Sequence, residues 1–145
     1  MKPPLIVGAG PAGSTAAIML AQAGIRPVLI ERQRETGDAL CGGFLSWRTL
    51  ESLRALGIEP TEGQVVRRLR LFAQGEKAEL RLPEAALGLS RHRLDSLLIA
   101  AAEAKGAGVE RGVHIKEWAE RRLITGDGAV MTPETLFLAT GKHDL

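Results

Sequence analysis

The sequence contains one cysteine, Cys41, among its 145 residues. A single cysteine excludes a disulfide within the chain and fits a reducing compartment, so we expect a cytoplasmic protein. Cationic residues are barely in excess, with 19 Lys and Arg against 17 Asp and Glu and a net charge of +2, and the two signs alternate along the chain. This small excess excludes an extended polyanion-binding surface, and we expect no nucleic-acid partner.

Histidine and cysteine, the side chains that most often bind zinc, are also sparse. The three histidines, His92, His114 and His143, lack metal-ligand spacing and paired cysteines, so we predict no metal site. No Ser/His/Asp arrangement can be argued, and no catalytic residue is named. Pro3–Ile25 runs 23 residues without a charge, but its glycines and prolines do not suit a spanning helix, and we expect no transmembrane segment.

A glycine-rich turn follows the first apolar run of the chain. Leu5–Val7 is purely apolar, as a strand buried on both faces of a parallel sheet is, and it stops at Gly8. Gly8 permits the tight turn, Gly10 lets the backbone approach a pyrophosphate, and Gly13 lets a helix pack close to a strand. The pattern predicts a dinucleotide-binding βαβ unit, with an ordinary, ligand-free βαβ turn as the less favoured alternative.

The next segments continue that unit. Ser14–Ala23 is predicted as a helix closed by Gly24, and its free N–H groups and positive dipole end would face the diphosphate. Pro27–Ile30 is predicted as a second buried strand ending at Glu31, 18 positions beyond Gly13. A carboxylate at that strand end accepts hydrogen bonds from the adenosine ribose and repels a 2′-phosphate. FAD or NAD is therefore favoured over NADP.

Cys41-Gly42-Gly43 precedes a helix that Ser46 is predicted to cap and Gly57 to end. The turn either places backbone near a ligand or is a simple connection with a buried, inert thiol, and the sequence alone leaves both readings open. Cys41 is not predicted to be a nucleophile, because no histidine or lysine neighbours it in the sequence.

Ser90 is predicted to cap a further helix that Gly106 closes. Arg91 and Arg93 lie in its first turn, where the helix dipole prefers anions. They either contact an anionic ligand or are solvated surface charges. The predicted apolar stripe of this helix consists of Leu94, Leu97, Leu98 and Ala101.

The remaining patterns are extended. Val65–Phe72 and Ala78–Leu82 flank Gln74-Gly75 and predict a β-hairpin inserted into the αβ framework. Val109–Ile115 is the candidate third strand of the nucleotide-binding sheet, and Leu136–Ala139 is a last buried strand, followed by Thr140-Gly141. Between them a β-meander is predicted over Lys116–Ala119, Arg122–Thr125 and Ala129–Thr132. The fold class is thus α/β, a Rossmann-like parallel sheet with a β-meander crossover and a partial β-hairpin insertion.

Four segments together resemble FAD-dependent oxidoreductases of the geranylgeranyl reductase and p-hydroxybenzoate hydroxylase type. The segments are Gly8–Gly13 with Glu31-Arg32, Cys41–Ser46, Ser90-Arg91 with Leu94-Asp95, and Ala139–Asp144. One departure is Ala39-Leu40, where members often carry a basic residue before the Cys-Gly pair.

The resemblance implies a role for each matched residue. Gly8, Gly10, Pro11, Ala12 and Gly13 would carry the diphosphate of FAD. Glu31 would bind the adenosine ribose, Arg32 the adenine side, and Val113 would contribute backbone to adenine. Arg91 would contact the flavin phosphate or ribityl chain, Cys41 and Gly42 would lie at the cofactor, and Ala139, Thr140 and Gly141 would pass near the ADP moiety.

The resemblance also implies the activity and its partners. We expect an FAD-dependent oxidoreductase, either a reductase or a monooxygenase, that acts on a small organic substrate such as an isoprenoid, with NAD(P)H as a candidate electron donor. The alternatives are an NAD-dependent dehydrogenase and a catalytically inactive nucleotide-binding fragment. Residues 1–145 would form a truncated, N-terminal portion of an FAD-binding domain, with 60–89 as a partial substrate-domain insertion. Further flavin-binding motifs are expected downstream of Leu145.

Overall fold

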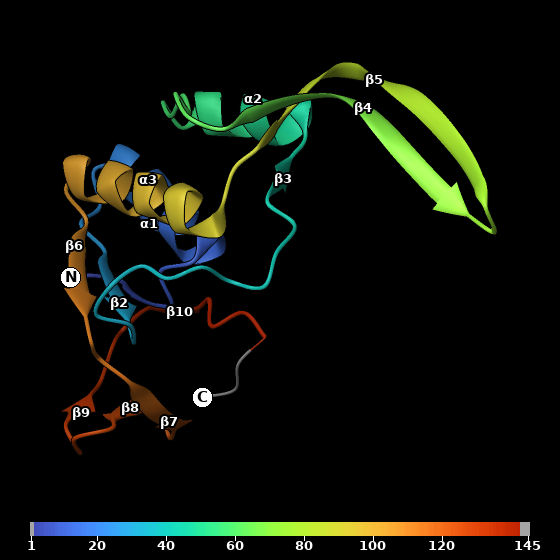
Figure 1. Ribbon diagram of the computed structural model, residues 1–145. Coiled ribbons are helices and arrows are strands. Elements are labelled where there is room, and N and C mark those ends of the chain that lie inside the picture. Colours follow the sequence, from blue (N-terminus) through green and yellow to red (C-terminus); the bar gives the residue numbers. More distant parts are fainter. Residues whose placement is uncertain (1, 143–145) are drawn as a thin grey trace. The chain divides into compact units, whose positions relative to one another are not determined.

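A computed structural model describes residues 2–142 of the chain. They form two compact units, which Figure 1 shows in the colours of the sequence. The first unit comprises the chain up to Gly37 and from Leu94 onward, and the second is Asp38–Arg93. The predicted α/β class with a parallel sheet is confirmed.

A four-stranded parallel sheet forms the centre of the first unit. Its strands in spatial order are β10 (Leu136–Leu138), β1 (Leu5–Val7), β2 (Val28–Glu31) and β6 (Gly108–Arg111). The chain leaves β1 toward β2 on one side and returns to β10 on the other side of β1, so the strand order reverses there. In open α/β sheets, ligands bind at the carboxyl ends of the strands at such a switch point.

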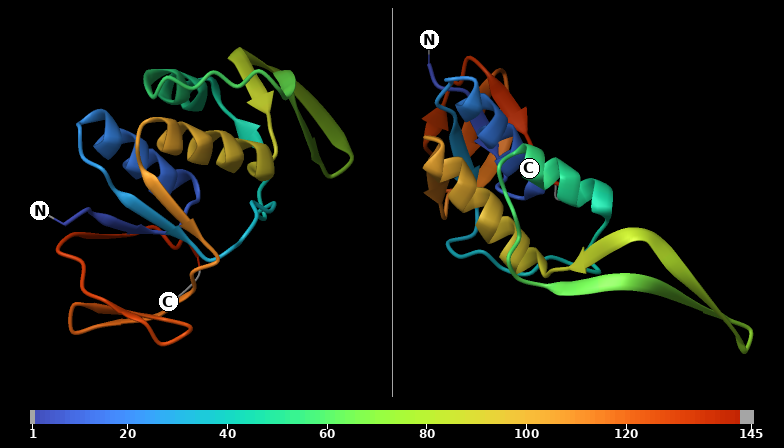
Figure 2. Two further views of the ribbon diagram at one scale, coloured as in Figure 1. Left: turned by 90° about the vertical axis from the view of Figure 1, so that its left-hand side faces the viewer. Right: turned by 90° about the horizontal axis from the view of Figure 1, so that it is seen from above.

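Helices and the meander cover opposite faces of this sheet (Figure 2). On one face lie α1 (Pro11–Gln22) and most of α3 (Arg91–Ala104). The other face carries a three-stranded antiparallel sheet, which confirms the predicted β-meander crossover between β6 and β10. Its strands are β7 (Ile115–Ala119), β8 (Arg122–Thr125) and β9 (Val130–Met131).

Coverage of both faces explains why β1 is apolar throughout. Leu5 and Val7 belong to one buried cluster with Ile115 and Leu123 of the meander. Ile6 points to the opposite side, because successive side chains of a strand alternate between faces, and it is fully buried too. Each such side chain stabilises the fold by about 1.5–3 kcal/mol relative to an exposed position.

Two predicted boundaries and one predicted burial differ clearly from the structure. Helix α1 begins at Pro11 rather than Ser14, because proline suits the first helical position, where its missing N–H is not needed. The third strand ends at Arg111 instead of Ile115, since Gly112 turns the chain with a φ of 76°. Strand β10 was expected to be buried, but Leu138 is 52% exposed, because β10 lies at the edge of the sheet.

The apolar stripe of α3 is rotated from its predicted position. Leu94 and Leu98 are buried as expected, whereas Leu97 and Ala101 are only half-buried. The helix is apolar on several overlapping stripes, so packing rather than the sequence pattern selects the buried one. The buried residues of α3 are Leu94, Asp95, Leu98, Ile99 and Ala102.

The uncharged run Pro3–Ile25 is divided between β1 and α1. Of the helices described between residues 2 and 142, none combines the length and the apolar character needed to cross a membrane.

The second unit contains a helix and a long β-hairpin (Figure 1). Helix α2 (Trp47–Ala55) is capped by Ser46 as predicted, since the Ser46 Oγ accepts a hydrogen bond from the Thr49 N–H at 3.3 Å. The sheet has the order β3-β5-β4. These strands are β3 (Phe44–Leu45), β4 (Gln64–Ala73) and β5 (Glu76–Gly88).

The hairpin itself is confirmed, with a second strand longer than predicted. Its turn residues Gln74 and Gly75 have φ angles of 51° and 83°, the positive values that a tight two-residue hairpin turn requires. Strand β3 pairs only with the end of β5, at Leu87 and Gly88. The rest of the hairpin has no third strand beside it among the described residues. On one face Leu69, Leu71 and Leu80 are therefore 45–53% exposed.

Ion pairs line the opposite face of the hairpin. Glu79 accepts hydrogen bonds from Arg70 at 2.8 Å and from Arg68 at 3.0 Å. The hydrogen bond from Arg70 is the main reason why the pKa of Glu79 is lowered. A lowered carboxyl pKa stabilises the folded hairpin above the ordinary carboxyl pKa, and this contribution is lost as the pH falls through the lowered value.

We predict that the outer part of the hairpin is the least stable element of the chain, because a two-stranded hairpin without a third strand is marginally stable in water. In hydrogen exchange followed by NMR, the amides of Leu69, Leu71 and Leu80 should exchange through local opening, while those of Ile6 and Leu29 should exchange only on global unfolding. Equal protection of the hairpin and the parallel sheet would contradict this prediction.

Candidate functional site

The turn after β1 is packed so tightly that side chains are excluded from it. Gly8 has a φ of 101°, and a Cβ atom there would lie 2.4 Å from the Ala139 carbonyl oxygen. A Cβ at Gly13 would lie 1.9 Å from the carbonyl oxygen of Gly8. These separations are shorter than van der Waals contact. The backbones of the turn, of α1 and of the segment after β10 thus meet directly.

The start of α1 lacks a side-chain cap. Gly10 is the N-cap residue and offers no side chain, and the first turn contains no acidic residue. The first helical bond runs from the Ser14 N–H to the Gly10 carbonyl at 3.0 Å, so the N–H groups of Ala12 and Gly13 precede the hydrogen-bonded ladder. This end of the helix carries the positive part of its dipole, and it suits a phosphate group.

Glu31 at the end of β2 is anchored to the turn. Its Oε2 accepts a hydrogen bond from the Ala9 N–H at 2.8 Å, and its Oε1 accepts one from the Gln33 N–H at 2.9 Å. A carboxylate has about four lone-pair sites, so it can also accept from the two hydroxyls of a ribose. The sequence predicted only the ribose contact, and the structure adds that the same carboxylate fixes the turn.

The loops after β2 and β6 lie against each other. The Val113 N–H donates to the Glu31 carbonyl at 3.1 Å. A Cβ at Gly112 would lie 3.1 Å from Cγ of Arg34, so the Arg34 side chain covers Gly112. Arg34 was not among the predicted residues, because no spacing in the sequence links it to Gly112. Arg32, which was predicted, is exposed.

The segment after β10 reaches the same turn. The Ala139 N–H donates to the Val7 carbonyl at 2.8 Å, and Gly141 has a φ of 72°. The structure thus brings Ala139 and Thr140, predicted from the far end of the chain, to Gly8. The last residues of this motif, His143 and Asp144, lie outside the described residues.

The Cys-Gly-Gly turn belongs to the second unit. Cys41 is a free thiol and is exposed, so the alternative of a buried, inert thiol is wrong. Gly43 has a φ of 65°, and a Cβ there would lie 2.9 Å from the Leu89 carbonyl oxygen, so pairing with Leu89 accounts for this glycine. Gly42 has open space beside it, with no heavy atom within 4 Å of a Cβ.

The N-terminus of α3 is already capped. The Ser90 Oγ accepts from the Arg93 N–H at 3.3 Å, as predicted, and Asp38 accepts from the His92 N–H at 2.9 Å. Arg93 also forms an ion pair with Glu62, so its charge is balanced within the chain. Arg91, half-buried, is the first residue of the helix. Unlike α1, α3 has side-chain acceptors at its first N–H groups.

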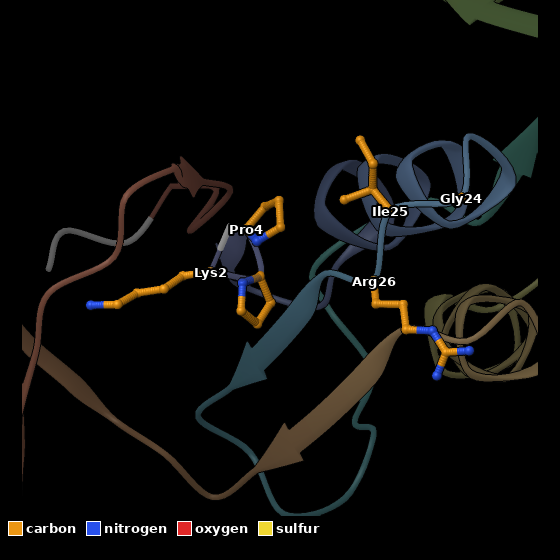
Figure 3. Close-up of a pocket in the computed structure, with 6 residues that line it drawn as sticks. Lys2, Pro4, Gly24, Ile25 and Arg26 are labelled. Carbon is orange, nitrogen blue, oxygen red and sulfur yellow. The ribbon is translucent and has the colours of Figure 1, made fainter.

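A surface hollow lies elsewhere in the first unit, at the start of β1 (Figure 3). Lys2 and Arg26 line it, but their side chains extend away from each other. The hollow is at the opposite end of β1 from Gly8, so it is separate from the glycine-rich turn. Within residues 2–142, no group of three or more His, Cys, Asp or Glu residues is arranged to hold a metal ion.

Comparison with known proteins assigns the family. A family model described as an FAD binding domain matches residues 2–143. The chain is 33% identical over 135 residues to digeranylgeranylglycerophospholipid reductase 1 of Methanopyrus kandleri, an alignment that covers 90% of this chain and 33% of the reductase. It is 46% identical over 55 residues to a phenol 2-monooxygenase of a Pseudomonas species, which covers 38% of this chain and 9% of that enzyme.

A solved structure shares the fold. 2-methyl-3-hydroxypyridine-5-carboxylic acid oxygenase matches with a TM-score of 0.77 and 23% identity over 94% of this chain and 39% of that one. The chain spans about a third of the length of the phospholipid reductases that it matches. A carboxylate at the position of Glu31 suits both FAD and NAD, and the family match favours FAD. The chain therefore belongs to the family of FAD binding domains.

Proposed function

We propose that the first unit holds the ADP part of FAD, and that the chain is the flavin-binding part of an oxidoreductase that acts on a small organic substrate. One observation carries this proposal, the uncapped N-terminus of α1 beside the anchored carboxylate of Glu31. Open N–H groups suit the diphosphate and the carboxylate suits the ribose, so the two features match adjacent parts of ADP.

The residues of the first unit take the following proposed roles. The diphosphate lies against the glycine-rich turn and the start of α1, Glu31 accepts from the ribose hydroxyls, and Arg32 and Val113 contact the adenine side. Ala139, Thr140 and Gly141 lie along the ADP moiety. The diphosphate contacts are Gly8, Gly10, Pro11, Ala12 and Gly13. For the second unit, the family resemblance supports Cys41, Gly42 and Arg91 as cofactor contacts.

The reaction that we propose is reduction of an isoprenoid-like double bond, with hydroxylation as the second candidate. The bound isoalloxazine would supply the redox chemistry. Reduction is favoured because the phospholipid reductase aligns with 90% of this chain, whereas the phenol 2-monooxygenase aligns with 38%. NAD(P)H is the proposed electron donor.

The proposed domain organisation is an FAD-binding domain over residues 1–145, with 60–89 contributed to a substrate domain. This assignment is supported by the position of the hairpin in the second compact unit. The single cysteine supports a cytosolic location.

The direct test of the proposed function is flavin retention. After incubation with FAD and desalting, the folded chain should keep the visible absorbance bands of a bound flavin. A folded chain that loses all flavin, and shows no binding of ADP by calorimetry, would contradict the proposal and favour an inactive fragment. A chain that binds NAD but not FAD would instead favour a dehydrogenase.

Glu31→Gln should weaken ADP binding by about tenfold to a hundredfold, because hydrogen bonds to a charged group contribute about 1.5–3 kcal/mol. Glutamine keeps only one acceptor oxygen and carries no charge, so it cannot accept from the Ala9 and Gln33 N–H groups at once, and its hydrogen bonds to the ribose are weaker. Titration calorimetry with ADP measures the effect. Glu35→Gln, which neutralises an exposed carboxylate on the same loop, is the matched control and should bind ADP like the native chain.

A further inference from the structure

Ser14 is the one fully buried polar side chain of α1, with 0% of its surface exposed. Its Oγ donates a hydrogen bond to the Ala9 carbonyl at 3.0 Å. The sequence identified Ser14 only as a helical residue after the glycine-rich turn. Its hydroxyl instead reaches back across the turn to the residue between Gly8 and Gly10.

Ala9 is consequently held on both sides. Its N–H donates to Glu31 at 2.8 Å, and its carbonyl accepts from Ser14 at 3.0 Å. The Ala9 side chain is 2% exposed, so neither polar group can turn to water without disturbing the packing. A polar group buried without a partner would be costly, and these two bonds satisfy both groups of Ala9.

The bond from Ser14 also fixes the direction of a donor in the turn. The carbonyl of Ala9 and the N–H of Gly10 belong to the same peptide, which is planar and trans. The two groups therefore point in opposite directions. Because the Ala9 carbonyl points toward the Ser14 hydroxyl, the Gly10 N–H points the opposite way. Gly10 is the N-cap of α1, so this donor directly precedes the open N–H groups of the helix start.

We propose that Ser14 is a positioning residue for the diphosphate, because its hydroxyl holds the Ala9–Gly10 peptide so that the Gly10 N–H faces the bound phosphates. This inference rests on the proposed function, since it presupposes that the turn binds ADP. Glu31 and Ser14 then act on one residue, Ala9, with the carboxylate serving the ribose and the hydroxyl serving only the diphosphate.

The test compares two ligands that differ in their phosphates. Ser14→Ala should weaken ADP binding by about tenfold, the effect expected for one lost and one misdirected hydrogen bond. Adenosine has no phosphates, so its affinity, measured by NMR titration, should not change. Thr15→Ala, which removes the neighbouring hydroxyl of α1, is the matched control and should bind both ligands like the native chain.

Circular dichroism establishes whether each variant folds. If Ser14→Ala does not fold, Ser14→Cys carries the test, because a thiol is a weak donor at the same position, and ADP affinity should be intermediate while adenosine affinity is unchanged. Equal ADP binding by the native chain and the variant would overturn the role of Ser14, and so would an equal loss for ADP and adenosine. Failure of the native chain to bind ADP would overturn the proposed function itself.

Discussion

The close approach of three backbone segments at the glycine-rich turn is the constraint on which the rest of the structure depends. Gly8 and Gly13 leave no room for a Cβ atom, so β1, α1 and the segment after β10 can meet. That meeting places the N-terminus of α1 at the switch point of the parallel sheet. If α1 began elsewhere, the N–H groups of its first turn would face water instead of a ligand.

Polar side chains then hold the glycine-rich turn in one conformation. Glycine imposes little conformational preference of its own, so a turn rich in glycine needs external anchors to keep one shape. Glu31 provides one anchor at the Ala9 N–H and Ser14 provides the other at the Ala9 carbonyl. The turn is thus organised before any ligand arrives, which reduces the entropic cost of binding.

Features that depend on residue spacing along the chain could be predicted from the sequence, whereas features that depend on packing in space could not. Gly8, Gly13 and Glu31 could be predicted, because a βαβ unit requires those residue types at nearly fixed spacing. The anchoring role of Ser14, and the cover that Arg34 provides for Gly112, could not, because both depend on how loops and helix pack in space. The exposure of Leu138 was also missed, since an apolar strand reads the same whether it is central or at an edge.

The central claim is that the backbone at the start of α1 binds the diphosphate, and an NMR titration of the 15N-labelled chain with ADP tests it most directly. The account predicts that the largest amide shifts fall on Gly10, Ala12 and Gly13, with smaller ones near Glu31. Shifts confined to the hollow beside Lys2 and Arg26, or to the start of α3, would contradict it, because ADP would then bind away from the glycine-rich turn.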